Sequence, residues 1–219
     1  MDFKQKVIAI DGPSASGKGT VASRVAAALG FDYLDSGALY RLTALYAQKQ
    51  GVEWHDEAAV AGLAQNLPVV FAGQKILLDG EDVSEAIRTE SIGMGASAVA
   101  ALPAVRAALL QRQRDFLGAA GLVGDGRDMG SVIFPQAELK VFLTASAKVR
   151  AERRAKQLGL PCEGVAFERI LSDIEARDEA DRRRPVAPLL QLPDAELLDT
   201  SDMGIEEAVK KVLDWYGKK

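Results

Sequence analysis

A nine-residue glycine-rich stretch constrains this chain more than any other feature, and it runs Gly12, Pro13, Ser14, Ala15, Ser16, Gly17, Lys18, Gly19, Thr20. It follows an apolar run at residues 7–10, which predicts a strand, and precedes a stretch at 21–29 with the spacing of an amphipathic helix. Glycines let backbone N–H groups approach an anion, the lysine adds a mobile positive charge, and the helix directs its positive dipole end at the same place. The stretch therefore predicts a phosphate-binding loop between a strand and a helix.

The residue after the lysine departs from the usual Walker pattern, in which Ser or Thr follows directly and ligates Mg²⁺. Here Gly19 intervenes and the hydroxyl arrives at Thr20. This ending resembles that of nucleoside monophosphate kinases, which implies phosphoryl transfer between two nucleotides. We expect Mg²⁺ to depend mainly on nucleotide oxygens and water, with Thr20 and Asp125 reaching it through water.

Composition limits the class of protein. With 219 residues, 48% hydrophobic and 26% charged, the chain suits one large globular domain or a domain with an insert. No run approaches the roughly 20 apolar residues of a membrane span, and residues 1–6 lack the apolar core of a secretion signal, so we expect a cytoplasmic protein. One cysteine and one histidine supply neither a disulfide nor a metal cluster. A net charge of −4 argues against nucleic acid as the main partner.

Strand and helix patterns alternate along most of the chain. Residues 31–34 predict a short strand, and Ser36 is expected to cap a helix running to about residue 50. Buried-strand patterns recur at 121–126, 139–143 and 197–199, and helical patterns at 147–158, 165–180 and 205–215. This alternation predicts an α/β fold with a parallel sheet of about five strands covered by helices on both faces. The core domain would comprise residues 1–55 and 102–219.

Residues 56–101 have a different character and predict an inserted domain. A helical pattern at 58–66 precedes three short strand patterns at 69–71, 75–78 and 82–83. Gly73-Gln74 and Asp79-Gly80 separate them and are hairpin turn signals, so the strands are expected to form a small antiparallel sheet. A helix is expected at 91–100, and Pro103 is suited to begin another that reaches about residue 117.

A basic stretch near the C-terminus predicts either a solvated helix with internal ion pairs or an anion clamp. Arg177, Asp181 and Arg184 fall on one helix face if the helix continues to Pro185. Two further arginines make the stretch cationic, and together with the phosphate loop they favour the clamp. Phosphoryl transfer needs stabilised charge and excluded water, and arginines on a lid, placed at about residues 155–185, provide both.

Four segments together resemble the bacterial cytidylate kinases, over essentially the whole chain. They are the loop at 12–20, Leu-Asp-Ser-Gly-Ala-Leu-Tyr-Arg at 34–41, Asp-Gly-Arg-Asp-Met-Gly at 125–130, and the stretch at 177–188. The second and third are the specific ones. The resemblance implies a P-loop kinase fold with a monophosphate-binding insert, and an enzyme that phosphorylates CMP and dCMP with MgATP. From the net charge and the lack of a long apolar run we expect no nucleic-acid or membrane partner, and we expect a monomer.

The resemblance also assigns roles by matching positions. Residues 12–20 would hold the ATP phosphates, with Lys18 bridging the donor and the transferred group, and Arg153 or Arg154 would lie over the adenine. The monophosphate would be surrounded by Ser36, Arg41, Arg127 and Arg184. Cytosine would be recognised by Ser97, Arg106 and Asp128, and the ribose would face Arg177 and Asp181. Lys18, Arg127 and Arg184 are the expected catalytic residues.

The hydrogen-bonding groups of cytosine support the assignment of Ser97, Arg106 and Asp128 to base recognition. Cytosine presents an amino donor beside acceptors at N3 and O2, so a carboxylate, an arginine and a hydroxyl match its edge, whereas uracil has the opposite polarity at position 4. The attacking CMP oxygen is anionic at neutral pH, so no dedicated base is required. The chain has Ala180 where family members often carry an arginine, which lowers the positive charge of the lid.

Other functions are compatible with the phosphate loop alone. A UMP or AMP kinase, or a small-metabolite kinase such as one acting on shikimate, would use the same fold, but a small polyol needs no base pocket. A GTPase-type switch would carry an Asn-Lys-x-Asp guanine signature, which is absent. A nucleic-acid-binding module is opposed by the acidic net charge and the few aromatic residues.

Overall fold

The computed structural model describes residues 5–72 and 75–219. They divide by contact into two compact units. The core unit comprises the described residues up to Leu34 together with Phe116–Lys219, and the insert unit comprises Asp35–Asp115. The insert unit is wider than the 56–101 insert expected from the sequence, because helices α2 (Ser36–Lys49) and α5 (Pro103–Arg114) pack against the helices of that segment.

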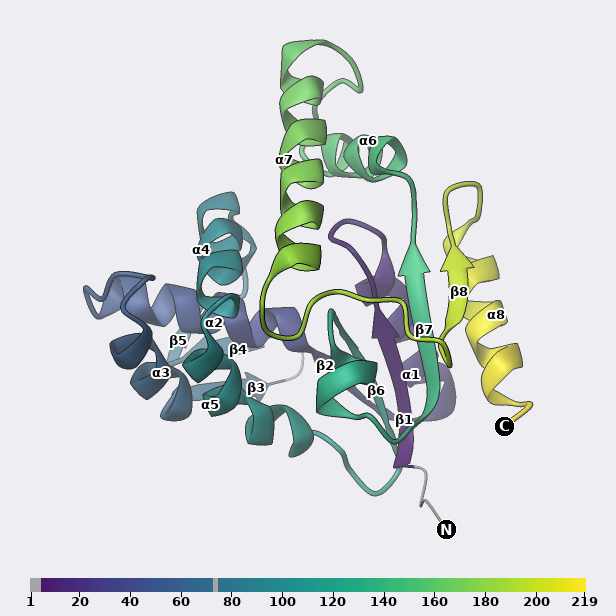
Figure 1. The fold of residues 1–219 in the computed structure, drawn as a ribbon, viewed down its shortest axis with the longest axis horizontal. Coiled ribbons are helices and arrows are strands. Elements are labelled where there is room, and N and C mark those ends of the chain that lie inside the picture. Colours follow the sequence, from purple (N-terminus) through teal and green to yellow (C-terminus); the bar gives the residue numbers. More distant parts are fainter. Residues whose placement is uncertain (1–4, 73–74) are drawn as a thin grey trace. The chain divides into compact units, whose positions relative to one another are not determined.

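A five-stranded parallel sheet forms the centre of the core unit, as the strand and helix alternation predicts (Figure 1). Its strands run in the order β2 (Asp32–Asp35), β6 (Leu122–Gly126), β1 (Gln5–Asp11), β7 (Ala137–Thr144) and β8 (Glu196–Asp199). Ile10 of β1 lies opposite Asp125 of β6 and Val141 of β7. The strand that precedes the glycine loop is therefore central, with neighbours on both sides. Ligands in open α/β sheets bind at the carboxyl end of such a strand.

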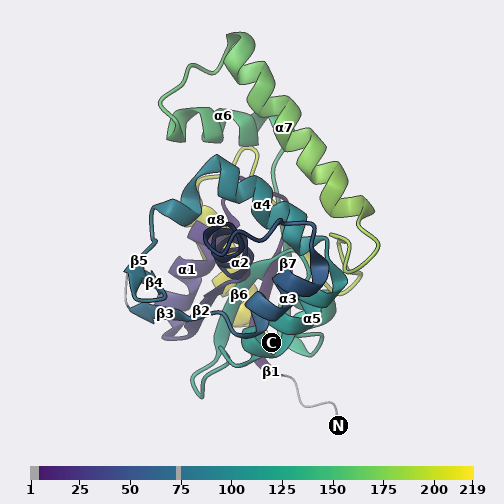
Figure 2. The same cartoon turned by 90° about the vertical axis from the view of Figure 1, so that its left-hand side faces the viewer.

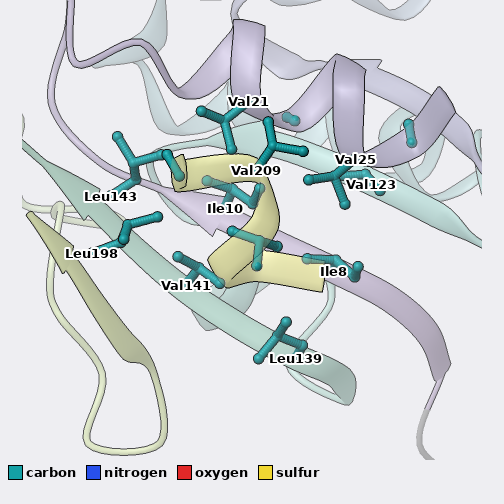
Figure 3. Packing of buried hydrophobic residues seen from close by; sticks show 14 residues of the cluster. Ile8, Ile10, Val21, Val25, Val123, Leu139, Val141, Leu143, Leu198 and Val209 are labelled. Atoms are coloured by element: carbon teal, nitrogen blue, oxygen red, sulfur yellow. The ribbon is translucent and has the colours of Figure 1, made fainter. Parts of the chain in front are cut away.

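One face of the sheet is covered by α1 (Lys18–Leu29) and α8 (Ile205–Tyr216). Alternate strand residues such as Ile8 and Ile10 point toward this face, where they meet Val21 of α1 and Val209 of α8 (Figure 3). These side chains are at most 8% exposed. Helix α1 ends at Leu29, and its C-cap, Gly30, has a φ of 66°, the left-handed conformation that glycine adopts readily.

Strand β7 leads into a pair of helices, α6 (Ala147–Gln157) and α7 (Gly164–Arg183), which lie side by side in both views (Figures 1 and 2). Ala151 and Ala155 of α6 are buried against Phe167 and Ile174 of α7. We call this pair the lid hairpin. The helix predicted at 165–180 is confirmed and is a few residues longer at its C-terminus.

The insert unit contains α2, α3 (Glu57–Gln65), β3 (Val69–Ala72), β4 (Lys75–Leu78), β5 (Glu81–Asp82), a 3₁₀ turn (Ala86–Arg88), α4 (Glu90–Ala100) and α5. Its three strands are antiparallel, as predicted, and they lie together in Figure 2. Asp79 and Gly80 have φ of 51° and 81°, which is the geometry of a two-residue type I′ hairpin. The other predicted turn, Gly73-Gln74, lies outside the described residues.

Two sequence predictions about helix ends are wrong. The cap of α2 is Asp35, whose Oδ1 accepts the Ala38 N–H at 3.0 Å, and Ser36 is the first helical residue. An aspartate one residue earlier, in extended conformation, reaches that N–H first. Helix α5 ends at Arg114 rather than near residue 117. Among residues 5–72 and 75–219, no single helix is long and apolar enough to cross a membrane, and α4 with α5 meets that test only as a pair bent by 100°.

Candidate active site

The glycine loop has the backbone of an anion-binding nest. Ala15 and Gly17 both have positive φ, 56° and 89°, which turns successive N–H groups toward one side. Gly17 is the N-cap of α1 and supplies no side-chain cap, so the first N–H groups of that helix are available to an anion. A Cβ on Gly12 would collide with the carbonyl oxygen of Leu143, which explains why only glycine fits there.

Polar side chains in the loop are ordered by the loop itself. Ser16 is buried and donates through Oγ to the Pro13 carbonyl at 2.9 Å. Lys18 is 8% exposed and donates through Nζ to the same carbonyl at 3.1 Å. The buried Oγ of Ser14 has no hydrogen-bond partner among the described residues. A buried hydroxyl without a partner fits a loop built around a ligand oxygen.

Gly19, where the loop departs from the Walker pattern, lies beside a carboxylate. Tyr33 donates through its hydroxyl to Asp125 Oδ1 at 2.7 Å, and Asp125 is 5% exposed. A Cβ on Gly19 would stand 3.5 Å from that hydroxyl and 3.9 Å from Asp125 Oδ2. The Asp125 carboxylate therefore lies next to the loop at Gly19, one residue before the exposed Thr20.

Asp125 suits a hard divalent cation. Mg²⁺ in proteins usually takes one or two carboxylates and keeps several waters and phosphate oxygens. No group of three or more His, Cys, Asp or Glu among the described residues forms a metal cage. One buried carboxylate beside a phosphate loop is the donor set expected for an ion that arrives with the nucleotide.

A second buried carboxylate holds the segment after β6. Asp11, the last residue of β1, accepts the N–H of Met129 through Oδ1 and the N–H of Gly130 through Oδ2, both at 2.8 Å. Burial raises the pKa of Asp11 to about 6, although the two N–H groups oppose that rise. The held segment follows directly on Arg127 and Asp128, and Asp128 is 3% exposed.

The predicted clamp residues of the core unit form an ion-pair cluster. Arg127 donates through Nε to Asp181 Oδ2 at 2.7 Å. Burial favours the neutral form of Asp181, but the positive charges of Arg127, Arg184 and Arg177 outweigh it and lower the pKa of this carboxyl. Arg184 ends α7 and donates through Nε to the Ala187 carbonyl at 2.7 Å. In the structure, Asp181 therefore lies close enough to Arg127, Arg177 and Arg184 for their charges to act on its carboxylate.

Two arginines of α6 contact the backbone of the phosphate loop. Arg150 donates to the Ser14 carbonyl at 3.2 Å and makes two bonds to Asp178 of α7, at 3.0 and 2.5 Å, with both side chains at most 5% exposed. Arg153 donates to the Ser16 carbonyl at 3.0 Å and to Thr200. The lid hairpin is therefore tied to the loop through two of the loop's backbone carbonyl groups.

Of the remaining predicted residues, Arg154 lies on α6 of the core unit, and the others belong to the insert unit. Ser36 is 4% exposed at the start of α2, and Arg41 lies one turn later and is partly buried. Arg106 is 7% exposed, donates to the Ala100 carbonyl at 3.1 Å, and has its guanidinium 5.5 Å from the centre of the Tyr40 ring. The Oγ of Ser97 donates to the Gly93 carbonyl at 3.3 Å.

Sequence reasoning missed Asp11, Tyr33, Arg150 and Asp178. Asp11 and Tyr33 lie next to segments that the sequence singled out, and an acid that ends a buried strand just before a glycine loop is a usable signal. Arg150 and Asp178 carried no signal beyond membership of a basic stretch. Each of these four residues acts through a partner at least 28 positions away.

A lysine-bearing anion nest at the end of a central parallel strand places the protein among the P-loop proteins, and a cluster of arginines near that nest is typical of P-loop kinases. The chain belongs to the cytidylate kinase family: the model of that family matches residues 8–218.

Curated relatives agree over nearly the whole chain. A cytidylate kinase of Neisseria gonorrhoeae is 79% identical over 215 residues, which is 98% of this chain and 99% of that protein. One of Chromobacterium violaceum is 62% identical, covering 97% of this chain and 96% of that protein. Among solved structures, an uncharacterised protein of Eubacterium ventriosum has a TM-score of 0.55 at 10% identity, covering 98% of this chain and all of that one. The last match concerns the fold alone.

Proposed function

We propose that this protein transfers the terminal phosphoryl group of ATP to CMP and dCMP, giving ADP with CDP or dCDP. We choose CMP as the acceptor because the chain belongs to the cytidylate kinase family, whose model matches residues 8–218. The choice of donor rests on the anion nest at Gly12 to Thr20 with its lysine.

The reaction is an in-line displacement at the γ-phosphorus. An oxygen of the CMP phosphate forms a bond to that phosphorus, and the bond from phosphorus to the β–γ bridging oxygen breaks, which releases ADP. The attacking oxygen is already anionic at neutral pH, so no side chain has to remove a proton. The one histidine, His55, is exposed in the insert unit, in keeping with chemistry that needs no base.

Stabilisation of charge is the main task of the protein. The loop N–H groups and the N-terminus of α1 would bind the donor phosphates, and Lys18 would bridge them to the transferred group. Mg²⁺ bound with the nucleotide would neutralise charge on the phosphates, with Asp125 and Thr20 reaching it through water. Arg127 and Arg184 would stabilise charge on the transferred group.

Substrate recognition is assigned by the same resemblance. Ser36 and Arg41 would bind the CMP phosphate, and Arg177 with Asp181 would face the ribose. Ser97, Arg106 and Asp128 would recognise the cytosine edge. Of the two candidates for the adenine, Arg154 is favoured, because Arg153 already donates to the Ser16 carbonyl and to Thr200.

A coupled ADP-release assay with a panel of monophosphates tests the proposal. Turnover should be high with CMP and dCMP, lower with UMP, and very low with AMP and GMP. Equal or higher turnover with AMP or GMP would refute it, and a preference for UMP would support the UMP kinase alternative. Omission of Mg²⁺ should abolish activity.

We also propose that the protein acts as a monomer in the cytoplasm, without nucleic acid or membrane as a partner. Light scattering after size-exclusion chromatography should give a mass near the 23.4 kDa of the chain. A mass of twice that value at assay concentrations would contradict the monomer.

A further inference from the structure

We propose that Asp11 is a positioning residue for the acceptor, whose carboxylate fixes the backbone that carries Arg127 and Asp128. The inference rests on the proposed function, because it concerns how the same site distinguishes cytosine from uracil. Asp11 itself is not one of the residues to which we assign a contact with ATP or CMP.

Asp11, at the end of β1, caps the turn of helix that follows Asp128. Residues Met129–Ile133 form one turn of π-helix, and the residue before it, Asp128, supplies no side-chain cap. The first two N–H groups of this turn are instead accepted by the two oxygens of Asp11, each at 2.8 Å. Because these groups are buried, loss of either bond would leave a polar group without a partner.

Close packing leaves this turn little freedom to move. A Cβ on Gly130 would stand 3.5 Å from Asp11 Oδ2 and 3.1 Å from Cδ of Lys140 on β7. Asp11 and Gly126 are also paired residues of β1 and β6. The backbone at Arg127 and Asp128 is therefore held from both ends, by the sheet before it and by Asp11 after it.

Asp11 also links the two substrate loops. Its backbone leads directly into Gly12 of the phosphate loop, and its side chain holds the segment that carries Asp128. A shift of Asp128 would weaken the hydrogen bond that distinguishes the cytosine amino group from the uracil carbonyl. The affinity for the donor nucleotide should therefore depend on the side chain of Asp11 far less than the preference for CMP over UMP does.

The test is Asp11→Asn, which keeps the size of the side chain but turns an NH₂ group toward one of the two N–H donors. We expect kcat/KM for CMP to fall about tenfold or more, from the cost of a buried unmatched donor. The ratio of kcat/KM for CMP to that for UMP should fall toward one, while ADP binding, measured by calorimetry, should change less than about threefold. A merely structural defect would lower both substrates equally and leave the ratio unchanged.

Asp56→Asn is the matched control, since Asp56 also accepts a backbone N–H, that of Ala59 at 3.1 Å, but at the exposed start of α3. It should leave the ratio unchanged. If Asp11→Asn does not fold, Asp11→Glu tests the same contact, because it keeps the charge but lengthens the side chain that accepts the two N–H groups, and it should lower the ratio in the same direction.

The outcomes separate the two proposals. If the wild-type protein does not prefer CMP, the proposed function fails. If it prefers CMP and a folded Asp11→Asn protein keeps that preference, or Asp11→Glu keeps it where Asp11→Asn does not fold, the positioning role of Asp11 is wrong and the function stands.

Discussion

Arg127 Nε lies 2.7 Å from Asp181 Oδ2, which joins the end of β6 to the last turns of α7. Both side chains are less than one fifth exposed, and this ion pair is the main reason why the pKa of Asp181 is lowered despite burial. The Nη1 of Arg127 also donates to the Gly126 carbonyl at 3.1 Å, so the guanidinium is held from two sides.

Asp181→Asn should therefore weaken both the placement of Arg127 and the contact with ribose. We expect kcat/KM for CMP to fall about 10- to 100-fold, as when one partner of a buried pair is lost, and the preference for CMP over dCMP to decrease. Steady-state assays with both substrates measure this. Asp214→Asn, which breaks an exposed pair with Lys210, is the control and should be neutral. Unchanged kinetics in the Asp181 variant would exclude the role.

Lys18→Met should remove the mobile positive charge of the loop with little effect on the fold. Methionine keeps the length and the apolar stem of the side chain, so the midpoint of thermal unfolding should move by only a few degrees. Loss of a preorganised charge at the transferred group should cut kcat by about 10²-fold or more. Lys210→Met, at an exposed position, should retain full activity. A folded Lys18→Met protein with near-normal kcat would overturn the assigned role.

Tyr33→Phe removes the hydroxyl that donates to Asp125 at 2.7 Å. The carboxylate should then be less well oriented, so the Mg²⁺ concentration for half-maximal activity should rise several-fold while stability falls by about 1 kcal/mol. A Mg²⁺ titration at saturating ATP and CMP, with Tm measured alongside, tests this. Tyr216→Phe is a close control, because Tyr216 also donates to a carboxylate, that of Glu138, at 2.9 Å. Glu138 lies at the start of β7, whereas the phosphate loop follows the end of β1. An equal Mg²⁺ shift in both variants would contradict the prediction.

Asp178→Ala should destabilise the core unit strongly. It leaves the guanidinium of Arg150 buried with two of its bonds lost, and breaking a buried pair in this way costs about 3–5 kcal/mol. Urea unfolding measures the loss. Asp214→Ala breaks the pair with Lys210, in which both side chains are more than half exposed, and should cost less than about 1 kcal/mol. Similar losses in the two variants would show that the Arg150 pair is worth no more than a surface pair.

Local features of the sequence were sufficient for most of the fold. Apolar periodicity and single punctuating residues, such as Gly30 after α1 and Pro103 at the start of α5, define elements because they act within one or two turns of chain. The parallel sheet follows from the alternation of such elements. The misplaced cap of α2 shows the limit of this method, because Asp35 and Ser36 are both good caps and backbone geometry selects between them.

The same distinction between local and long-range features applies to the site. The phosphate loop is contiguous, so its nest geometry follows from its own residues. The roles of Asp11 and Asp178 depend on which strands and helices become neighbours, and Asp11 meets its partners 118 and 119 positions away. No local pattern encodes such a distance, and the order of the strands has to be known first. The residue roles taken from the family resemblance stay predictions until the variants are measured.

Asp11 should also give the protein a distinctive dependence of stability on pH. Its folded pKa of about 6 lies above the ordinary 3.8, so between these values the folded state binds more protons than the unfolded state. The contribution therefore favours folding in acid and is lost as the pH rises through 6. Asp181 and Asp194, whose pKa values are lowered, act in the opposite direction, but they are common to wild type and to Asp11→Asn.

The difference in free energy of unfolding between wild type and Asp11→Asn isolates this group. Relative to the variant, wild type should be about 1 kcal/mol more stable at pH 5 than at pH 8. Urea unfolding at pH 5, 6.5 and 8 measures the difference, with Asp56→Asn as the control whose difference from wild type should not show this rise toward acid. A constant difference between wild type and Asp11→Asn across that range would mean that Asp11 stays ionised down to pH 5. The two N–H groups would then outweigh the cost of burying its charge.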